Sequence, residues 1–142
     1  MIKQLTVFLE NTQGRLAALC RCLGDAGVNM QALTIADTRD YGLVRIICDD
    51  PDRAAEALEK NDFRAYVKEV SAIQAPNRPG GLADLLETLQ DLGLNIEYGY
   101  CFSTTEEHAT EVLKIANEED AAEASAKLEA AGFKVLTQED LR

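Results

Sequence analysis

One stretch of nine residues occurs twice in the sequence, as NTQGRLAAL at residues 11–19 and as NRPGGLADL at residues 77–85. The 66-residue register continues without a gap, because Gly27 and Asn29 match Gly93 and Asn95. Nine of the twenty positions from Asn11 to Met30 are identical to those from Asn77 to Ile96. A repeat of this kind predicts two halves built from the same elements.

The hydrophobic pattern predicts the order βαββαβ in each half. In the first half we expect strands over residues 2–9, 28–36, 43–48 and 65–70, a turn over 37–42, and helices that end at Gly27 and run over 51–60. In the second half we expect strands over 70–75, 95–103, 108–116 and 134–136, and helices that end at Gly93 and run over 121–131. Leu16, Leu19, Cys20 and Leu23 form the apolar face of the first helix, and Leu82, Leu85, Leu86 and Leu89 repeat it.

This order predicts an α+β fold of tandem ferredoxin-like βαββαβ units, in which right-handed crossovers place both helices on one face of the sheet. A unit of about 70 residues is marginally stable alone and leaves its sheet edges unpaired. We therefore expect two domains, residues 1–67 and 68–142, packed side by side with joined antiparallel sheets.

The composition excludes several classes of function. The chain has 142 residues, with 14 Lys and Arg against 25 Asp and Glu, so its net charge is −11. Such a surface repels nucleic acid and anionic membranes. No apolar run is long enough for a bilayer span, and the N-terminus does not resemble a signal peptide, so we expect a cytoplasmic protein. We interpret Cys20, Cys22, Cys48 and Cys101 as small buried hydrophobic residues in a reducing compartment, without a bound metal.

The sequence contains no convincing catalytic constellation. His108 is the only histidine, we expect it at the surface, and no glycine pattern for a nucleotide cofactor is present. The alternative of a small acylphosphatase-like hydrolase would need Arg15 to hold an anion and Asn29 to orient water, and the rest of that signature is absent. We therefore predict a protein that is not an enzyme and needs no cofactor.

Two asparagine pairs match between the halves although a hydrophobic core does not require them. They are Asn11 with Asn77 before the helix, and Asn29 with Asn95 after it. An asparagine amide can bind both the ammonium and the carboxylate of a free amino acid, and a helix N-terminus attracts the carboxylate. Gly14 and Gly80 let the backbone approach such a ligand closely. The alternative is that the asparagines merely cap helices or stabilise turns.

At these residues the chain resembles the ACT domain family, whose βαββαβ modules bind amino acids. The second half matches the family's D/N-x-P-G-x-L loop and its G-[LVI]-N-I strand start, whereas Gln13 replaces the proline in the first half. The resemblance is strongest to the serine-binding regulatory domain of phosphoglycerate dehydrogenase, although Leu9 and Ala75 stand where that domain has a histidine. The resemblance implies ligand contacts at Asn11, Gln13, Gly14, Arg15, Leu16, Asn29, Met30, Asn77, Pro79, Gly80, Gly81, Leu82, Asn95 and Ile96.

The resemblance also implies that Asn11 meets Asn95, and Asn77 meets Asn29, across the seam between the two units. Because Arg15 is matched by Gly81, we expect the two sites to bind one ligand with different affinities. The implied function is that of a regulatory protein that senses a free L-amino acid and signals to an amino-acid metabolic enzyme. We expect a homodimer. The alternative is an interaction module without a ligand.

Overall fold

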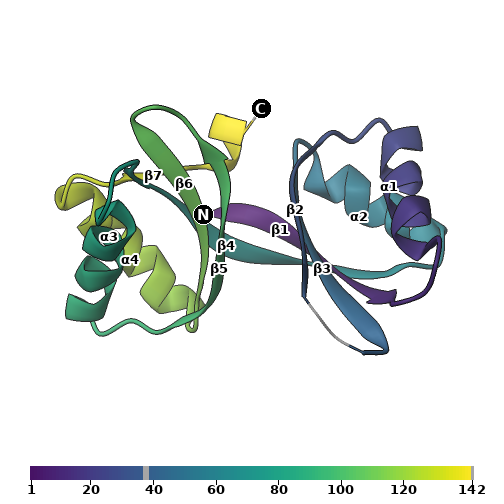
Figure 1. The fold of residues 1–142 in the computed structure, drawn as a ribbon, viewed down its shortest axis with the longest axis horizontal. Coiled ribbons are helices and arrows are strands. Elements are labelled where there is room, and N and C mark those ends of the chain that lie inside the picture. The colour runs from purple at the N-terminus through teal and green to yellow at the C-terminus, as the bar shows by residue number, and fades with distance from the viewer. Residues whose placement is uncertain (37–38, 142) are drawn as a thin grey trace. The chain divides into compact units, whose positions relative to one another are not determined.

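The computed structural model describes residues 1–36 and 39–141 and contains two compact units (Figure 1). The first unit is Lys3–Lys68, and the second is Glu69–Arg142 together with Met1–Ile2. The first half of the chain contains β1 (Ile2–Glu10), α1 (Arg15–Asp25), β2 (Met30–Ala36), β3 (Tyr41–Cys48) and α2 (Pro51–Lys60). Strand β4 (Arg64–Pro76) follows, and then α3 (Gly81–Asp91), β5 (Ile96–Thr104), β6 (His108–Ile115), α4 (Glu118–Ala130), β7 (Lys134–Val135) and the 3₁₀ helix η1 (Gln138–Leu141).

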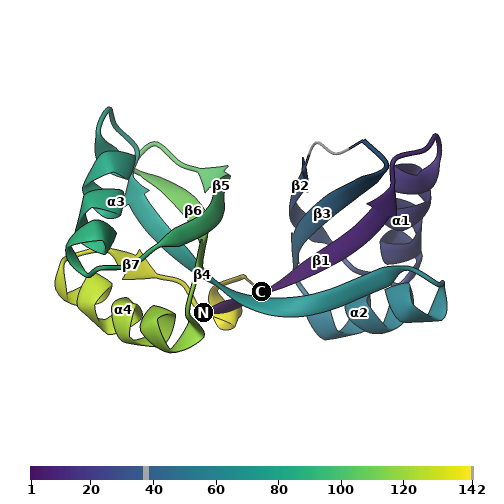
Figure 2. The same cartoon turned by 90° about the horizontal axis from the view of Figure 1, so that it is seen from below.

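Both units have the same strand order. In the first unit the order is β2-β3-β1-β4, and in the second it is β5-β6-β4-β7. The β1–β3, β2–β3, β4–β6, β4–β7 and β5–β6 pairings are antiparallel, with Val7 opposite Val44 in the first unit and Ile73 opposite Glu111 in the second. The two helices of each unit cover one face of its strands (Figure 2). The predicted α+β fold of tandem βαββαβ units is therefore confirmed, and the side-by-side packing of the units stays a prediction.

Strand β4 differs from the prediction because it is one continuous strand of 13 residues. We expected one strand to end and another to begin near Val70, but no turn residue interrupts the run from Arg64 to Pro76. The same strand therefore lies at the edge of the first unit's strand order and in the interior of the second.

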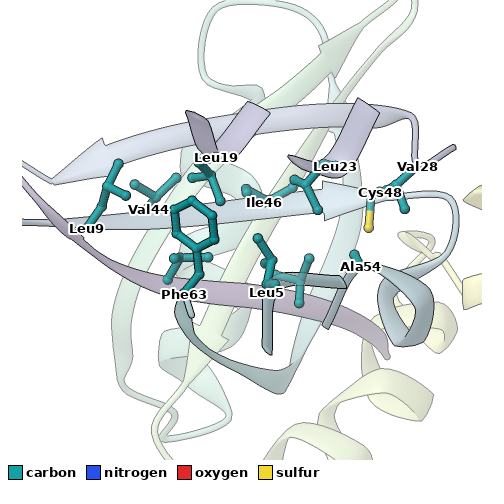
Figure 3. Close-up of a cluster of buried hydrophobic side chains, with 12 residues drawn as sticks. Leu5, Leu9, Leu19, Leu23, Val28, Val44, Ile46, Cys48, Ala54 and Phe63 are labelled. Atoms are coloured by element: carbon teal, nitrogen blue, oxygen red, sulfur yellow. The ribbon is translucent and has the colours of Figure 1, made fainter. Parts of the chain in front are cut away.

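Each unit has its own hydrophobic core. In the first unit Leu5, Val44 and Ile46 from the strands pack with Leu19 and Leu23 of α1, and all five side chains are fully buried (Figure 3). In the second unit Ile73, Leu113, Leu85 and Leu89 form the corresponding cluster. The matched pairs Leu19 with Leu85 and Leu23 with Leu89 thus occupy equivalent core positions, whereas Leu16 and Leu82 are exposed. Burial of the core side chains is the main source of stability of each unit.

The remaining differences from the sequence-based expectations are local. Helix α4 begins at Glu118, three residues before the expected start, because the Asn117 side chain accepts a hydrogen bond from the Glu119 amide at 3.0 Å. The helix η1 was not predicted. Part of the turn expected over 37–42 lies outside the described residues, and β3 already begins at Tyr41. No helix in the described part of the chain is long and apolar enough to cross a membrane.

The interpretation of all four cysteines as buried residues is wrong. Cys48 alone is buried, Cys20 and Cys22 are half-buried, and Cys101 is exposed. The cysteine pair in α1 lies at the margin of the apolar face, and Cys101 lies on β5, which ends its unit's strand order. All four are free thiols.

Candidate functional site

The two loops with the repeated sequence have the same backbone conformation. Gly14 and Gly80 immediately precede α1 and α3 with φ angles of +87° and +83°, which side-chain-bearing residues rarely adopt. No side chain caps either helix start. The first helical amides, of Arg15 and Gly81, donate to the loop carbonyls of Thr12 and Arg78. The next amides of the first turn have no partners within a helix, so both N-termini present N–H donors and a partial positive charge.

The loop asparagines connect each loop to a hairpin of the same unit. The Asn77 side-chain amide donates to the Thr105 carbonyl at 2.6 Å, and its backbone N–H donates to the Glu107 carbonyl at 2.9 Å. Asn11 repeats both bonds, to the carbonyls of Arg39 at 3.2 Å and Asp40 at 2.9 Å. The asparagines therefore do not cap the helices, because glycines hold the cap positions, and their amide groups hold the loops in place.

The second asparagine of each pair lies beyond the far end of the helix. Asn29 exchanges hydrogen bonds with Asp49, and the Asn95 carbonyl accepts from the Ala116 amide at 3.1 Å. A helix of 11 residues is about 16 Å long, so the two asparagines of one unit cannot contact one small ligand. The same separation keeps Arg15 from acting together with Asn29, as the hydrolase alternative requires. The pairing across the seam stays a prediction.

The two helix starts differ at their first residue. Arg15 begins α1, and its guanidinium carbon lies 4.8 Å from the centre of the Phe63 ring. Gly81 begins α3 and is buried, and a side chain there would overlap the carbonyl oxygen of Pro76. The first unit thus accommodates a large side chain at the helix start, and the second unit tolerates none.

Each unit also has a pocket at equivalent positions near these loops. In the first unit Phe8, Glu10, Arg15, Tyr41 and residues 62–64 enclose about 350 Å³. In the second unit Gln74, Pro76, Arg78, Asp84, His108 and residues 131–134 enclose about 280 Å³. The exposed ion pair between Arg78 and Asp84, at 2.6 Å, occupies one wall of the second pocket. His108 is exposed, as expected.

A larger groove of about 690 Å³ lies between α3 and β5 in the second unit. Its lining is Leu82, Leu86, Leu89, Gln90, Leu94, Asn95, Ile96, Gly99, Tyr100, Cys101, Glu111 and Leu113. The groove brings together three of the predicted contact residues, namely Leu82, Asn95 and Ile96. The predicted residues Asn77, Pro79, Gly80 and Gly81 do not line it.

The other predicted contact residues lie in the first unit. Gln13 and Gly14 are exposed in the loop before α1, Leu16 is 37% exposed on that helix, and Met30 begins β2 and packs against the core. Apart from Arg15 in the loop pocket, none of these residues lines one of the pockets described above.

Sequence reasoning missed Gly99, Cys101 and Glu111 as groove residues. Glu111 lies inside a strand next to the apolar run Val112-Leu113, where a charged residue is unusual, and this signal was available. Among the described residues, no three His, Cys, Asp or Glu side chains are grouped so that they could hold a metal ion.

The groove raises the pKa of the Cys101 thiol. Burial of its sulfur raises the thiol pKa above the usual value, and the negative charge of Glu111 raises it further. A hydrogen bond to the Ser103 carbonyl, with sulfur and oxygen 3.6 Å apart, belongs to the same environment. The neutral thiol is therefore favoured over the reactive thiolate.

We predict that the variant Glu111→Gln alkylates faster at Cys101. Removing the neighbouring negative charge lowers the thiol pKa, so a larger fraction is thiolate at pH 7.5. The rate of iodoacetamide modification, followed at each cysteine by mass spectrometry, should rise several-fold at Cys101 and stay unchanged at Cys20 in the other unit. An unchanged rate at Cys101 would contradict an electrostatic influence of Glu111 on the thiol.

Comparison with known proteins identifies relatives. A family model described as an ACT domain pair matches residues 1–138. Protein BT0572 from Bacteroides thetaiotaomicron is 37% identical, with 99% of this chain and 94% of that chain covered and a TM-score of 0.90. The ligand-free regulatory subunit of aspartate kinase from Thermus thermophilus has 17% identity, coverage of 92% and 90%, and a TM-score of 0.69, and shares the fold. A search of curated protein sequences finds no match.

Proposed function

The chain belongs to the ACT domain pair family, and on this premise we propose that it is a non-catalytic regulatory protein that binds a free L-amino acid. The proposed contacts are the two repeated loops, the helix N-termini that follow them, and the asparagines Asn29 and Asn95. The main support for the proposal is that α1 and α3 both begin without a side-chain cap, directly after a glycine with a positive φ angle. Such a start can receive a carboxylate.

The output of the sensor is proposed to be a changed contact with an amino-acid metabolic enzyme. The regulatory subunit of an aspartate kinase has the same fold, which supports this class of partner. A ligand shifts such an equilibrium only by its difference in affinity between the two states. We further propose a homodimer in the cytoplasm, where the four free thiols suit a reducing environment.

The proposal is tested by measuring the melting temperature of the full chain with each of the twenty L-amino acids. We expect one amino acid, or a small group of similar ones, to raise it in a concentration-dependent way. In Asn77→Ala the loop loses its bond to the Thr105 carbonyl, so the affinity for that ligand should fall roughly tenfold, the size of one hydrogen bond.

The matched control is Asn61→Ala. The Asn61 side chain also donates to a backbone carbonyl, that of Ala57 at 2.8 Å, but it lies at the end of α2 and outside the proposed site. This variant should melt at a lower temperature and keep the ligand affinity. If no amino acid raises the melting temperature, the sensor proposal is wrong and the interaction module without a ligand is favoured.

A further inference from the structure

The groove between α3 and β5 has an apolar wall and a single charge. Leu82, Leu86 and Gln90 are spaced by four residues along α3 and so form one stripe on the helix, which faces Ile96 and Tyr100 of β5. Leu82 and Leu86 are 43% and 38% exposed, which is high for leucine. Glu111 is the only acidic or basic residue of the described lining. The volume lies within the range of small-molecule sites.

The groove exists because the second unit departs from the first at two strand positions. Gly99 pairs with Leu113 as Leu33 pairs with Ile46, but Leu33 packs against the core of its unit and Gly99 has no side chain. The position two residues before Leu113 is Glu111, and the one two residues before Ile46 is Val44, which is fully buried in the first core. Leu113 fills the place beside Gly99, because a Cβ there would lie 2.6 Å from Leu113 Cδ2. The first unit thus has two apolar side chains, Leu33 and Val44, where the second unit has the Leu113 side chain against a glycine and the carboxylate of Glu111.

Glu111 lies on the face of the sheet that the helices cover. It is paired with Ile73 on one side and Cys101 on the other, and paired residues of antiparallel strands point to the same face. It is only 8% exposed, and within the described residues it forms no ion pair with a lysine, arginine or histidine. Burial of a carboxylate without a cationic partner costs free energy.

We propose that this groove binds a small molecule in which an ammonium group is attached to a bulky apolar body. The ammonium would meet the Glu111 carboxylate, and the apolar body would lie along Leu82, Leu86 and Leu113. The inference rests on the proposed function, binding of a free L-amino acid. It restricts that amino acid to one with a large apolar side chain. An amine without a carboxylate carries the same ammonium group and apolar body, so the experiment includes both amino acids and amines.

The experiment is isothermal titration calorimetry on the full chain with two sets of three probes. One set is L-leucine, 3-methylbutylamine and 4-methylpentanoate, and the other is L-phenylalanine, 2-phenylethylamine and 3-phenylpropionate. Each set contains the amino acid, the amine without the carboxylate, and the acid without the amine. We expect a probe with an ammonium group to bind, and the two acids without one to bind at least tenfold more weakly.

Variants identify the groove as the place of binding. Glu111→Gln keeps the size of the side chain and removes its charge, so the affinity for the ammonium-bearing probe should fall at least tenfold. Leu86→Asn alters the apolar wall at a partly exposed position and should also weaken binding. Glu87→Gln is the matched control, because Glu87 is exposed on the same helix and does not line the groove; its affinity should be unchanged.

Three results would overturn the inference. The first is equal binding of the acids and the amines, which would remove the role of the charge. The second is an amino acid that binds Glu111→Gln and the natural chain equally and is weakened only by Asn77→Ala, which would leave the proposed function standing and place the ligand elsewhere. The third is no binding of any probe, and a changed oligomeric state of Leu86→Asn in light scattering would then make the groove an interface between copies.

Discussion

The variant Gly81→Ala should lose about 3 kcal/mol of unfolding free energy, the upper end of what overpacking a buried position costs. An alanine Cβ at this position would overlap the carbonyl oxygen of Pro76 and lie 2.9 Å from its carbonyl carbon. Those atoms belong to the backbone, and the Pro76 carbonyl already accepts a hydrogen bond from the Arg78 amide at 3.0 Å. The loop cannot move aside without breaking that turn. Denaturation by urea, with the midpoint read at constant slope, measures the loss.

The control for this variant is the same substitution at Gly24. That glycine lies within α1, has no atom within 4 Å of an added Cβ, and does not have a positive φ. Gly24→Ala should therefore raise stability by about 0.5–1 kcal/mol, the difference in helix propensity. If Gly81→Ala were as stable as the natural chain, the tight packing of the α3 start against β4 would be refuted.

The variant Glu111→Val should gain about 2 kcal/mol of unfolding free energy, because it replaces a buried carboxylate, which has no cationic partner among the described residues, by an apolar side chain. Valine is the residue that the first unit has at the same place, Val44, so its shape suits this strand position. Urea denaturation measures the gain. The same variant should lose binding of ammonium-bearing ligands, so that stability and binding change in opposite directions.

The reciprocal change, Val44→Glu, is the matched test. Val44 is fully buried in the core of the first unit, so a carboxylate there should cost about 4 kcal/mol, as expected for an unpaired buried charge. A loss of stability in Glu111→Val would show that the carboxylate already has a strong partner within the fold, beyond the thiol of Cys101, and would count against the groove as a cation site.

The fold could be predicted from the repeat because the repeated residues act on the local backbone and on the periodicity of each element. Gly27 and Gly93 adopt the positive φ angles expected after α1 and α3. Of the leucines at helical spacing, Leu19, Leu23, Leu85 and Leu89 are buried, whereas Leu16, Leu82 and Leu86 are exposed, contrary to the predicted apolar faces. Pro51 begins α2, as its position after the turn indicated. These features depend on backbone conformation and on periodicity, and a single sequence contains both.

The groove could not be predicted because it depends on which side chains meet between the helices and the sheet of the second unit. Gly99 reads as an ordinary glycine until the strand register places it where Leu33 fills the other unit. The role of Asn77 was likewise only half predictable, because its side chain reaches a carbonyl of the hairpin 28 residues later in the chain. Contacts of this kind are set by tertiary structure, and the pattern of one sequence does not contain them.

The continuous strand β4 has a consequence for dividing the molecule into fragments. A cut at the boundary between the units, after Lys68, falls in the interior of a hydrogen-bonded strand and separates Met1–Ile2 from the residues with which they are grouped. Neither fragment would contain a complete set of strands, and each would expose new edges that invite aggregation. A protease that needs a flexible linker should find none between Arg64 and Pro76, so limited digestion is expected to spare this strand.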